Sequence, residues 1–287
     1  EVDEGRVLDR RALLDAIRAG KGRFVQLGEN EFTALSTELH RRLMELAEFG
    51  QQHGKGVRMH PLASFALEDL AASATVKGDK HWREHLARMR SNEEYVPVLP
   101  STLQAELRDY QRDGFDWLAR LAHWGVGACL ADDMGLGKTV QALALVLLRA
   151  PLGPTLVIAP SSVCMNWASE AARFAPTLKV RLFGAGDRAE QLADAGPFDL
   201  VIASYGLLQN EAAMFASRRW NTVVLDEAQA IKNSQTKRSQ AVMSLQADFR
   251  MAATGTPLEN HLGELWNLFN FINPGLLGSA DQFQMRF

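Results

Sequence analysis

A glycine-rich segment that ends in a lysine and a threonine has the residue types needed to bind phosphate. It runs from Asp132 to Thr139 with the sequence DDMGLGKT, between a short apolar run and a helical pattern. In a P-loop, backbone N–H groups and a helix N-terminus wrap the phosphate, the lysine reaches the β/γ-phosphates and the hydroxyl binds Mg²⁺. Asp132 stands where the strict pattern has its first glycine. The segment predicts nucleotide binding, and an ordinary strand-to-helix turn is the alternative.

Two adjacent carboxylates at the end of a second apolar run could complete such a site. Asp226 and Glu227 follow the run TVVL at 222–225. In P-loop ATPases one carboxylate holds the metal ion, and the other orients and deprotonates water. We therefore expect Asp226 to hold Mg²⁺ and Glu227 to act as the base. A solvated Asp-Glu pair at a strand end is the alternative.

Short apolar runs alternate with helical patterns after Pro100, and these elements must position the two motifs. The alternation predicts an α/β fold, in which helices cover both faces of a parallel sheet. Ligands of such sheets bind beyond the carboxyl ends of the strands. The expected strands are Ala128–Ala131, Thr155–Ala159, Lys179–Phe183, Leu200–Ser204, Thr222–Asp226 and Arg250–Ala253. The expected helices are Thr139–Arg149, Trp167–Phe174, Leu207–Phe215, Lys237–Leu245 and Leu262–Phe271.

The first 100 residues are predicted to be mostly helical with a small β-hairpin. The hairpin would pair Arg23–Leu27 with Phe32–Leu35. Helices are expected at Asp9–Ile17, after Ser36 or Thr37 with the stripe Leu39, Leu43, Leu46 and Phe49, and around Leu62–Leu70 and Trp82–Met89. Ser91–Pro100 contains two prolines and breaks both periodicities. We expect a linker there, between an accessory segment at 1–100 and a second domain at 101–287.

Two histidines in the accessory segment have a spacing that suits a metal ion. His81 and His85 are four residues apart on an expected helix. The sequence offers no cysteine and no third ligand at motif spacing nearby. A solvated helix face is therefore the interpretation we favour over a zinc site.

The composition is that of a folded globular protein. Of 287 residues, 47% are hydrophobic and 23% charged, with 22 Gly and 10 Pro, which excludes a collagenous or disordered chain. The net charge of −3 means that any nucleic-acid contact must come from a local patch. Cys129 and Cys164 are the only cysteines, as in proteins of the reducing cytoplasm. The apolar run Ala142–Leu148 is far shorter than the roughly 20 residues of a membrane span, and we expect no membrane partner. The acidic start without Met predicts no signal peptide and a chain that begins within a longer protein.

Three further groups of residues fall at the same end of the predicted sheet. LRDYQRDGFDWL at 107–118 precedes the P-loop, and APSS at 159–162 leads to Asn166 and Trp167, with Ser204 and Tyr205 ending the fourth strand. The last expected strand ends in ATGTPLEN at 253–260 and is followed by ELWNL at 264–268.

With these motifs in this order, the chain resembles the Swi/Snf-type ATPases of helicase superfamily 2, particularly their bacterial and archaeal single-chain members. The resemblance covers about Leu103 to the C-terminus and implies a RecA-like first lobe. Family members carry DEMGLGKT or DDMGLGKT at the P-loop, so Asp132 matches them. The commoner second motif is DEAH, and Gln229 replaces its histidine, which leaves open how ATP is coupled to the rest of the machine.

The resemblance implies roles for individual residues. Lys138 and Glu227 would be catalytic, Thr139 and Asp226 would hold Mg²⁺, and Gln111 would read the adenine edge. The nucleotide would contact Gln111, Asp133, Met134, Gly135, Leu136, Gly137, Lys138, Thr139 and Val140. Nucleotide binding would be coupled to domain movement through Gln229, Thr254, Gly255 and Thr256. A helix-surface role for Gln111 and a plain strand-to-helix turn at 254–256 are the alternatives.

A second set of residues would contact DNA if the resemblance holds. Hydroxyl and N–H groups at helix starts would touch backbone phosphates at Ser161, Ser162, Ser204 and Tyr205, without sequence readout. The family also places the short basic cluster Lys232, Asn233, Lys237 and Arg238 near DNA, and a solvated helix face is the alternative. Four tryptophans are expected in the core rather than as base-stacking platforms: Trp117, Trp124, Trp167 and Trp266.

Taken together, the resemblance implies the first motor lobe of an ATP-dependent translocase on double-stranded DNA. Such motors bind ATP and Mg²⁺ between two RecA-like lobes and supply an arginine finger across the cleft. The chain ends at Phe287, shortly after the first lobe's last motif. We therefore expect the chain alone to be nearly inactive without the second lobe. Two alternatives are a strand-separating DNA or RNA helicase and a nucleotide-gated binding module without turnover.

Overall fold

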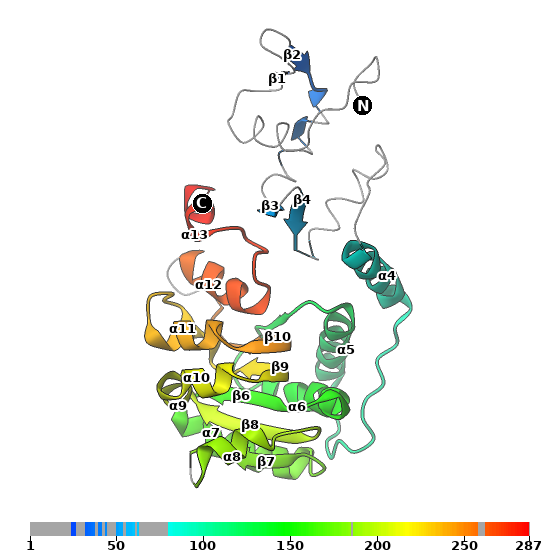
Figure 1. Ribbon diagram of the computed structural model, residues 1–287. Helices are drawn as coiled ribbons and strands as arrows, with labels where there is room; N and C mark the ends of the chain where they lie inside the picture. The colour runs from blue at the N-terminus through cyan, green and yellow to red at the C-terminus, as the bar shows by residue number, and fades with distance from the viewer. Residues whose placement is uncertain are drawn as a thin grey trace. The chain divides into compact units, whose positions relative to one another are not determined.

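The computed structural model describes residues 24–26, 32–37, 40–41, 44, 50–53, 56–60, 62, 80–184, 186–257 and 262–286. The chain divides into two compact units (Figure 1). One comprises Glu1–Leu86 and Pro274–Phe287, and the other comprises Ala87–Asn273. The boundary between the two units lies between Leu86 and Ala87, before Pro100. The domain boundary that the sequence suggested at Pro100 stays a prediction.

The first unit contains the predicted hairpin and one that was not expected. Strand β1 (Phe24–Gln26) pairs antiparallel with β2 (Phe32–Ala34), which confirms the hairpin. Strands β3 (Gly50–His53) and β4 (Gly56–Met59) form a second antiparallel pair, and α13 spans Ala280–Arg286. Three predictions for this unit fall outside the described residues. They are the helix at 9–17, the apolar stripe at 39, 43, 46 and 49, and the part of the helix at 62–70 that follows Leu62.

Six parallel strands form the sheet of the second unit, in the order β5-β10-β9-β6-β8-β7. This confirms the α/β fold and each expected strand. The strands are β5 (Ala128–Leu130), β6 (Thr155–Ala159), β7 (Lys179–Leu182), β8 (Asp199–Ser204), β9 (Arg219–Leu225) and β10 (Gln246–Ala253). Every residue of β6 is buried, because helices cover the sheet on both faces.

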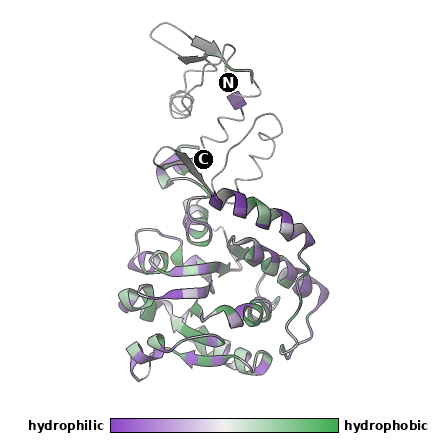
Figure 2. Ribbon diagram, turned by 45° about the vertical axis from the view of Figure 1, so that its right-hand side comes forward, coloured by the Kyte–Doolittle hydropathy of each residue, from purple (hydrophilic) through white to green (hydrophobic). Residues whose placement is uncertain are grey.

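Two hydrophobic cores lie on the two faces of this sheet. On one face pack α5 (Asp109–Trp124), α6 (Lys138–Arg149) and α7 (Ser161–Phe174). The other face carries α8 (Arg188–Ala193), α9 (Tyr205–Asn210), α10 (Ala212–Ala216), α11 (Lys237–Met243) and α12 (Leu262–Ile272). The described residues also form α4 (Lys80–Glu94) and the 3₁₀ helices η2 (Ala150–Leu152) and η3 (Ala228–Ile231). Green and purple alternate along the helices in Figure 2, as expected where one helix face is buried.

The strand register brings the motifs to one edge of the sheet. Ala253 of β10 lies opposite Leu130 of β5, and Ala252 lies opposite Leu225 of β9. Leu225 in turn lies opposite Ile158 of β6. The segments that follow these strands therefore start side by side, so the P-loop, Thr254, Asp226 and the start of α7 share one edge.

Several helices differ from the prediction. The expected helix at 207–215 is two helices, α9 and α10, because Glu211 between them has φ −114° and ψ 30°. Helix α7 begins at Ser161 rather than Trp167, and α4 extends to Glu94, into the predicted linker. The short helix α8 was not expected, although Asp187 caps it by accepting from Ala189 N at 2.9 Å and Glu190 N at 3.1 Å.

Close packing between α5 and α6 depends on a glycine inside a helix. A Cβ atom at Gly114 would lie 2.0 Å from Oε1 of Gln141, a fully buried residue of α6. We expect Gly114→Ala to destabilise the protein by about 1–3 kcal/mol through overpacking, although alanine has the higher helix propensity. Urea unfolding would measure this.

Gly263 of α12 is the matched control, because a Cβ there meets nothing within 4 Å. Gly263→Ala should be neutral or stabilising. If Gly114→Ala is equally well tolerated, the packing of α5 on α6 does not depend on the missing side chain.

No helix among those that the structure describes is long and apolar enough to span a membrane.

Cys129 and Cys164 are free thiols, and burial raises the pKa of Cys129 to about 11. The Cys129 thiol is therefore protonated at neutral pH and behaves as a small apolar side chain.

Candidate functional site

The loop between β5 and α6 has the backbone shape of a phosphate-binding loop. Gly135 has φ +84° and Gly137, which caps α6, has φ +75°. Side chains other than glycine rarely adopt this left-handed conformation. A Cβ at Gly135 would meet nothing within 4 Å, whereas one at Gly137 would lie 2.4 Å from Nε2 of Gln111. The loop therefore leaves its open side free for a ligand and packs its other side against α5.

The lysine of this loop is bound to the loop itself. Lys138 Nζ donates to the carbonyl oxygens of Asp132 at 2.7 Å and Asp133 at 2.9 Å. The Asp132 carboxylate accepts from Gln141 Nε2 at 3.1 Å, which ties the start of the loop to α6. The aspartate that replaces the first glycine of the strict P-loop pattern therefore has a structural role of its own.

Gln111, predicted to read adenine, lies against the P-loop. Its side chain is 8% exposed, and its amide donates to Leu136 O at 3.1 Å and accepts from Arg108 N at 3.0 Å. The hydroxyl of Tyr110 donates to the same Leu136 oxygen at 3.2 Å. An amide has two donors and two lone pairs, so Gln111 keeps one of each after these bonds. The adenine contact stays a prediction.

A cleft of about 480 Å³ opens beside the P-loop. The P-loop side contributes Gly137 and Val140, and α7 contributes Glu170, Arg173 and Phe174. The segment before α5 completes the wall with Gln104, Ala105 and Glu106. Sequence reasoning missed the α7 residues, although their helical spacing from Trp167 places Glu170 one turn further along the same helix.

Glu170 of α7 lies beside the P-loop, in the wall of the same cleft. Burial raises the pKa of its carboxyl group, and a hydrogen bond with the side chain of Thr139 opposes this shift. The charge of Asp226 raises the same pKa further. The predicted metal ligands Thr139 and Asp226 therefore both lie within interaction range of one carboxylate.

Asp226 is held from several sides at the end of β9. Its Oδ2 accepts from Trp167 Nε1 at 2.8 Å, and its Oδ1 accepts from Glu227 N at 3.0 Å. Its carbonyl oxygen accepts from the hydroxyl of Tyr205 at 2.8 Å. Burial raises the pKa of the Asp226 carboxyl group, an effect that the Trp167 hydrogen bond opposes and the Glu227 charge reinforces. Lys138 lowers this pKa, so the P-loop lysine and both carboxylates lie within electrostatic reach of one another.

Glu227 has a strained backbone. Its φ of 49° and ψ of 53° lie in the left-handed region, where a side chain with Cβ is disfavoured. Its carboxylate accepts from Gln229 Nε2 at 2.6 Å. Strain of this kind persists only where the surroundings impose it, and it is common at functional sites.

The strain at Glu227 leads to a prediction about stability. We expect Glu227→Gly to be more stable than Glu227→Ala by about 1 kcal/mol, because glycine adopts the left-handed conformation without cost. Both variants lack the carboxylate, so their difference in free energy of unfolding isolates the backbone. Equal unfolding midpoints in urea would contradict a strained Glu227.

The predicted coupling residues form a chain of hydrogen bonds that starts at Glu227. Gln229 Oε1 accepts from the hydroxyl of Thr254 at 2.8 Å, and Thr254 Oγ1 accepts from Thr256 N at 3.1 Å. A Cβ at Gly255 would lie 3.0 Å from Cγ of Met134, so this segment also touches the P-loop. The amide of Gln229 therefore joins the carboxylate to the segment after β10, with its NH₂ group toward Glu227.

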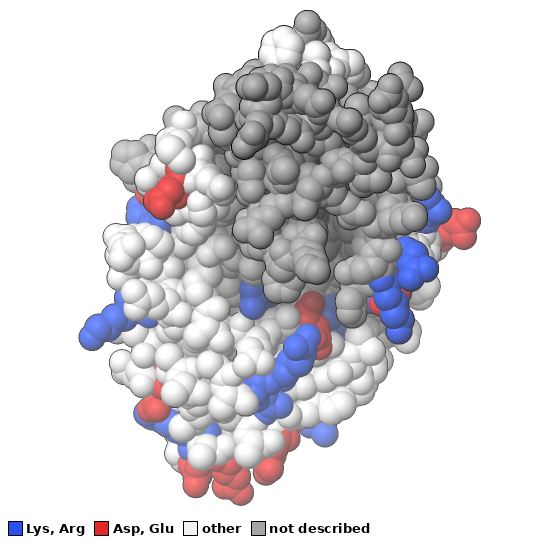
Figure 3. Space-filling view, turned by 45° about the horizontal axis from the view of Figure 1, so that its top comes forward, with Lys and Arg blue, Asp and Glu red and all other residues white. Residues whose placement is uncertain are grey.

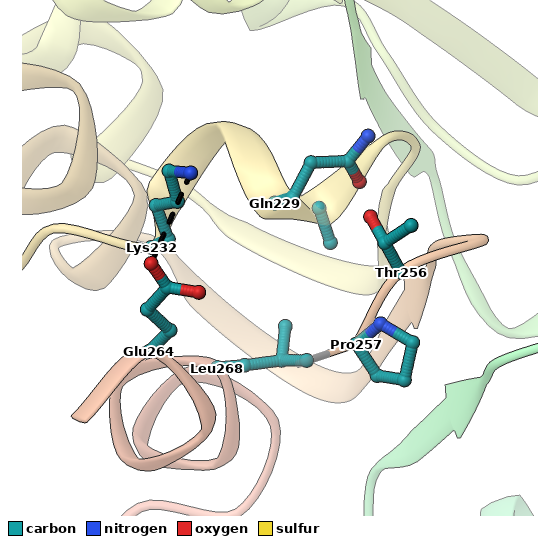
Figure 4. Close-up of a pocket in the computed structure, with 7 residues that line it drawn as sticks. Gln229, Lys232, Thr256, Pro257, Glu264 and Leu268 are labelled. Atoms are coloured by element: carbon teal, nitrogen blue, oxygen red, sulfur yellow. Dashed lines mark ion pairs between the residues drawn. The ribbon is translucent and has the colours of Figure 1, made fainter. Parts of the chain in front are cut away.

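Figure 4 shows this region from the side of the small pocket that Gln229 and Thr256 line. Lys232 from the end of η3 points toward Glu264 of α12, and Nζ lies 3.8 Å from the carboxylate. The pocket holds only about 10 Å³, which suits one water molecule at most. We therefore assign it no ligand.

The predicted DNA-contacting residues do not all reach solvent. Ser161 and Ser162 are exposed in the first turn of α7, and Asn233 is exposed after η3. Ser204 caps α9 by accepting from Leu207 N at 3.2 Å. Tyr205 differs from the prediction, because its ring is 3% exposed and its hydroxyl is bound to Asp226 O. Its hydroxyl supports the end of β9 and is not available to a phosphate, whereas a phosphate contact of its backbone N–H at the start of α9 stays a prediction.

Charge on the visible surface is mixed. Lys and Arg residues are interspersed with Asp and Glu on the face drawn in Figure 3, among the residues that it colours. Lys232 pairs with Glu264, whereas Arg238 lies with its guanidinium 5.6 Å from the ring centre of Tyr205. This distribution agrees with the net charge of −3 and restricts a DNA contact to local groups.

Two of the four tryptophans are in the core as predicted. Trp124 is 4% and Trp167 1% exposed, and Trp266 is half-buried. The prediction was wrong for Trp117, which is 44% exposed because Phe115 and Leu118 occupy the buried face of α5. The side chains of His81 and His85 lie outside the described residues. Among the side chains that are described, no group of three His, Cys, Asp or Glu residues could hold a metal ion alone.

The arrangement fits a nucleotide and a hard divalent cation. A loop with two left-handed glycines at a helix N-terminus presents N–H groups to an anion. The hydroxyl of Thr139 and the carboxylate of Asp226 are oxygen donors of the kind that Mg²⁺ prefers. Lys138 supplies a positive charge and Glu227 a carboxylate beside them.

Comparison with known proteins agrees with this site. The model of the SNF2-related domain matches residues 110–287. YwqA of Bacillus subtilis (strain 168) is 40% identical over 276 residues, which cover 92% of this chain and 29% of YwqA. The chromatin-remodeling ATPase INO80 of Gibberella zeae is 40% identical over 201 residues, 64% of this chain and 10% of INO80. This chain thus spans less than a third of the length of these relatives.

A solved structure has the same fold. The Sulfolobus solfataricus SWI2/SNF2 ATPase core in complex with dsDNA matches with a TM-score of 0.62 and 42% identity, over 67% of this chain and 41% of that one. The same core domain without DNA matches with a TM-score of 0.58 and 40% identity, over 66% and 39% of the two chains. The family model covers more than half of this chain, and the sheet has the expected parallel topology. The chain therefore belongs to the SNF2-related family of Swi/Snf-type superfamily 2 ATPases, in the region of their first RecA-like lobe.

Proposed function

We propose that the chain is the first motor lobe of an ATP-dependent translocase or remodeller that acts on double-stranded DNA. The observation that carries the proposal is the strand register, which brings the loop of Lys138 and the Asp226–Glu227 pair to one edge of the sheet. The relatives named as ATPases and the related core solved with dsDNA support the same activity.

In this proposal the P-loop holds ATP and Thr139 and Asp226 hold Mg²⁺. The metal ion, when bound, would neutralise charge on the phosphate oxygens. Lys138 would exchange its bonds to the loop carbonyls for bonds to the phosphates. Glu227 would act as the general base. Gln229 orients its carboxylate, which has lone pairs left to accept a proton from water.

We further propose that the hydrolysis reaction needs a second RecA-like lobe. A cationic finger supplied across the cleft is worth about 10³–10⁵ in rate. The chain alone is therefore expected to be nearly inactive. DNA would lie on Ser161, Ser162 and Ser204 and on the exposed groups of Lys232 and Asn233, as position-holding contacts to the phosphate backbone. A cytoplasmic location fits the two free thiols.

The direct test is phosphate release by the complete protein with and without double-stranded DNA, at stated salt. The proposal predicts stimulation by duplex DNA and no strand separation on a forked duplex. Efficient unwinding would indicate a helicase instead. Nucleotide binding with no DNA-dependent phosphate release would indicate a binding module without turnover.

A further inference from the structure

Both oxygens of the Asp226 carboxylate accept a hydrogen bond that fixes its orientation. Oδ2 accepts from the indole N–H of Trp167 at 2.8 Å, and Oδ1 accepts from Glu227 N at 3.0 Å. A carboxylate offers about four lone pairs, so each oxygen keeps one for a metal ion. The Trp167 side chain is 1% exposed and packs in the core between α7 and the sheet. The indole therefore cannot turn away without disturbing that core.

The same helix also borders the P-loop. Glu170 lies three residues beyond Trp167 on α7 and lines the cleft beside the P-loop together with Gly137 and Val140. Helix α7 therefore borders both the Asp226 carboxylate and the phosphate-binding loop.

We propose that Trp167 is a positioning residue for the magnesium site and acts through Asp226. The inference rests on the proposed function, because it assumes that Asp226 holds Mg²⁺. Groups that orient a metal ligand from behind typically change metal affinity or activity by about 10–100-fold when they are removed. Helix α7 then orients this ligand from a rigid element of the core.

A buried tryptophan could serve the core alone, and a second one in this sheet separates the two roles. Trp220 on β9 is 0% exposed, and its indole N–H donates to Phe215 O at 3.2 Å, a carbonyl oxygen that is no part of the site. Trp167→Phe and Trp220→Phe each remove one buried N–H donor and keep a six-membered aromatic ring. Their costs in packing should be similar, and only the first touches Asp226.

The test measures Mn²⁺ uptake by the complete protein in the presence of ATP, followed by electron paramagnetic resonance, since Mn²⁺ substitutes for Mg²⁺ at oxygen ligands. Trp167→Phe should raise the Mn²⁺ concentration for half-saturation by about 10–100-fold. Trp220→Phe should leave it unchanged. ATP affinity without metal should be the same in both variants, which shows that the P-loop is intact.

Trp167→His provides a second comparison, which separates the lost donor from the lost packing. Both variants put a smaller ring in place of the indole, but histidine keeps a ring N–H donor and phenylalanine has none. We expect Trp167→His to restore part of the Mn²⁺ uptake that Trp167→Phe loses. Equal uptake by Trp167→Phe and Trp220→Phe, or by the two Trp167 variants, overturns the inference alone. No uptake with ATP by the unmodified protein overturns the proposed function, and the inference with it.

Discussion

We expect Glu227→Gln to lower ATP turnover by the complete protein by about 10²–10⁴-fold, the range that a positioned general base contributes. The amide cannot take a proton from water at neutral pH. Its Oε1 can still accept the bond from Gln229 Nε2 that the carboxylate accepts at 2.6 Å, so the local structure should persist. ATP affinity should therefore stay within a few-fold of that of the unmodified protein, because the P-loop binds the phosphates.

Turnover is measured as phosphate release with saturating duplex DNA, and affinity by fluorescence of a labelled nucleotide. Glu190→Gln is the control. Glu190 is exposed on α8, and its substitution removes the same charge away from the site. Turnover near that of the unmodified protein in Glu227→Gln would remove Glu227 from the role of base.

Lys138→Ala should weaken both binding and turnover. A hydrogen bond to a charged group is worth about 1.5–3 kcal/mol, so losing the ammonium should raise the dissociation constant for ATP by about 10–150-fold. Turnover should fall further, because charge on the phosphates increases as the reaction proceeds. The carbonyl oxygens of Asp132 and Asp133 also lose their donor in this variant, so the loop should become less ordered.

Lys179→Ala is the matched control for this variant. Lys179 is exposed at the start of β7, at the opposite edge of the sheet from β5. The same titration with labelled nucleotide measures both variants. Equal ATP affinity in Lys138→Ala and Lys179→Ala would mean that the DDMGLGKT segment is only a strand-to-helix turn.

The strands could be predicted because each is a short apolar run with polar or turn-forming residues at its ends. Thr155–Ala159 and Leu200–Ala203 are apolar runs followed by Pro160 and Ser204, and burial on both faces of a parallel sheet requires such apolar runs. Local signals also placed the P-loop and the Asp226–Glu227 pair, since a strand that ends in a motif puts that motif at the carboxyl edge. The break between α9 and α10 has no such signal at Glu211, where the chain departs from helical geometry.

The contacts behind the site could not be predicted from the sequence. Trp167 and Asp226 are 59 residues apart, and their hydrogen bond exists only because α7 packs on the sheet beside the end of β9. Packing on the other face of the sheet buries Tyr205 at the start of α9 and turns its hydroxyl inward to Asp226 O, against the expectation that this hydroxyl contacts DNA. Helical spacing identified Trp167 as a core residue, yet spacing carries no information about which partner an indole N–H will find. Tertiary packing decides such pairings.

The position of β5 has a consequence for how the protein is made. Among the strands that the structure describes, β5 precedes the P-loop and pairs with β10 alone, which is the last strand of this sheet in the sequence. About 120 residues separate the paired ends of the two strands, which at about 5–20 residues per second amounts to roughly 6–25 s of translation. During that interval the ribosome exposes β5 without its neighbour, while β6, β8 and β9 can already assemble. The strand that carries the nucleotide-binding loop therefore gains its neighbour only after the other strands of this sheet have been synthesised.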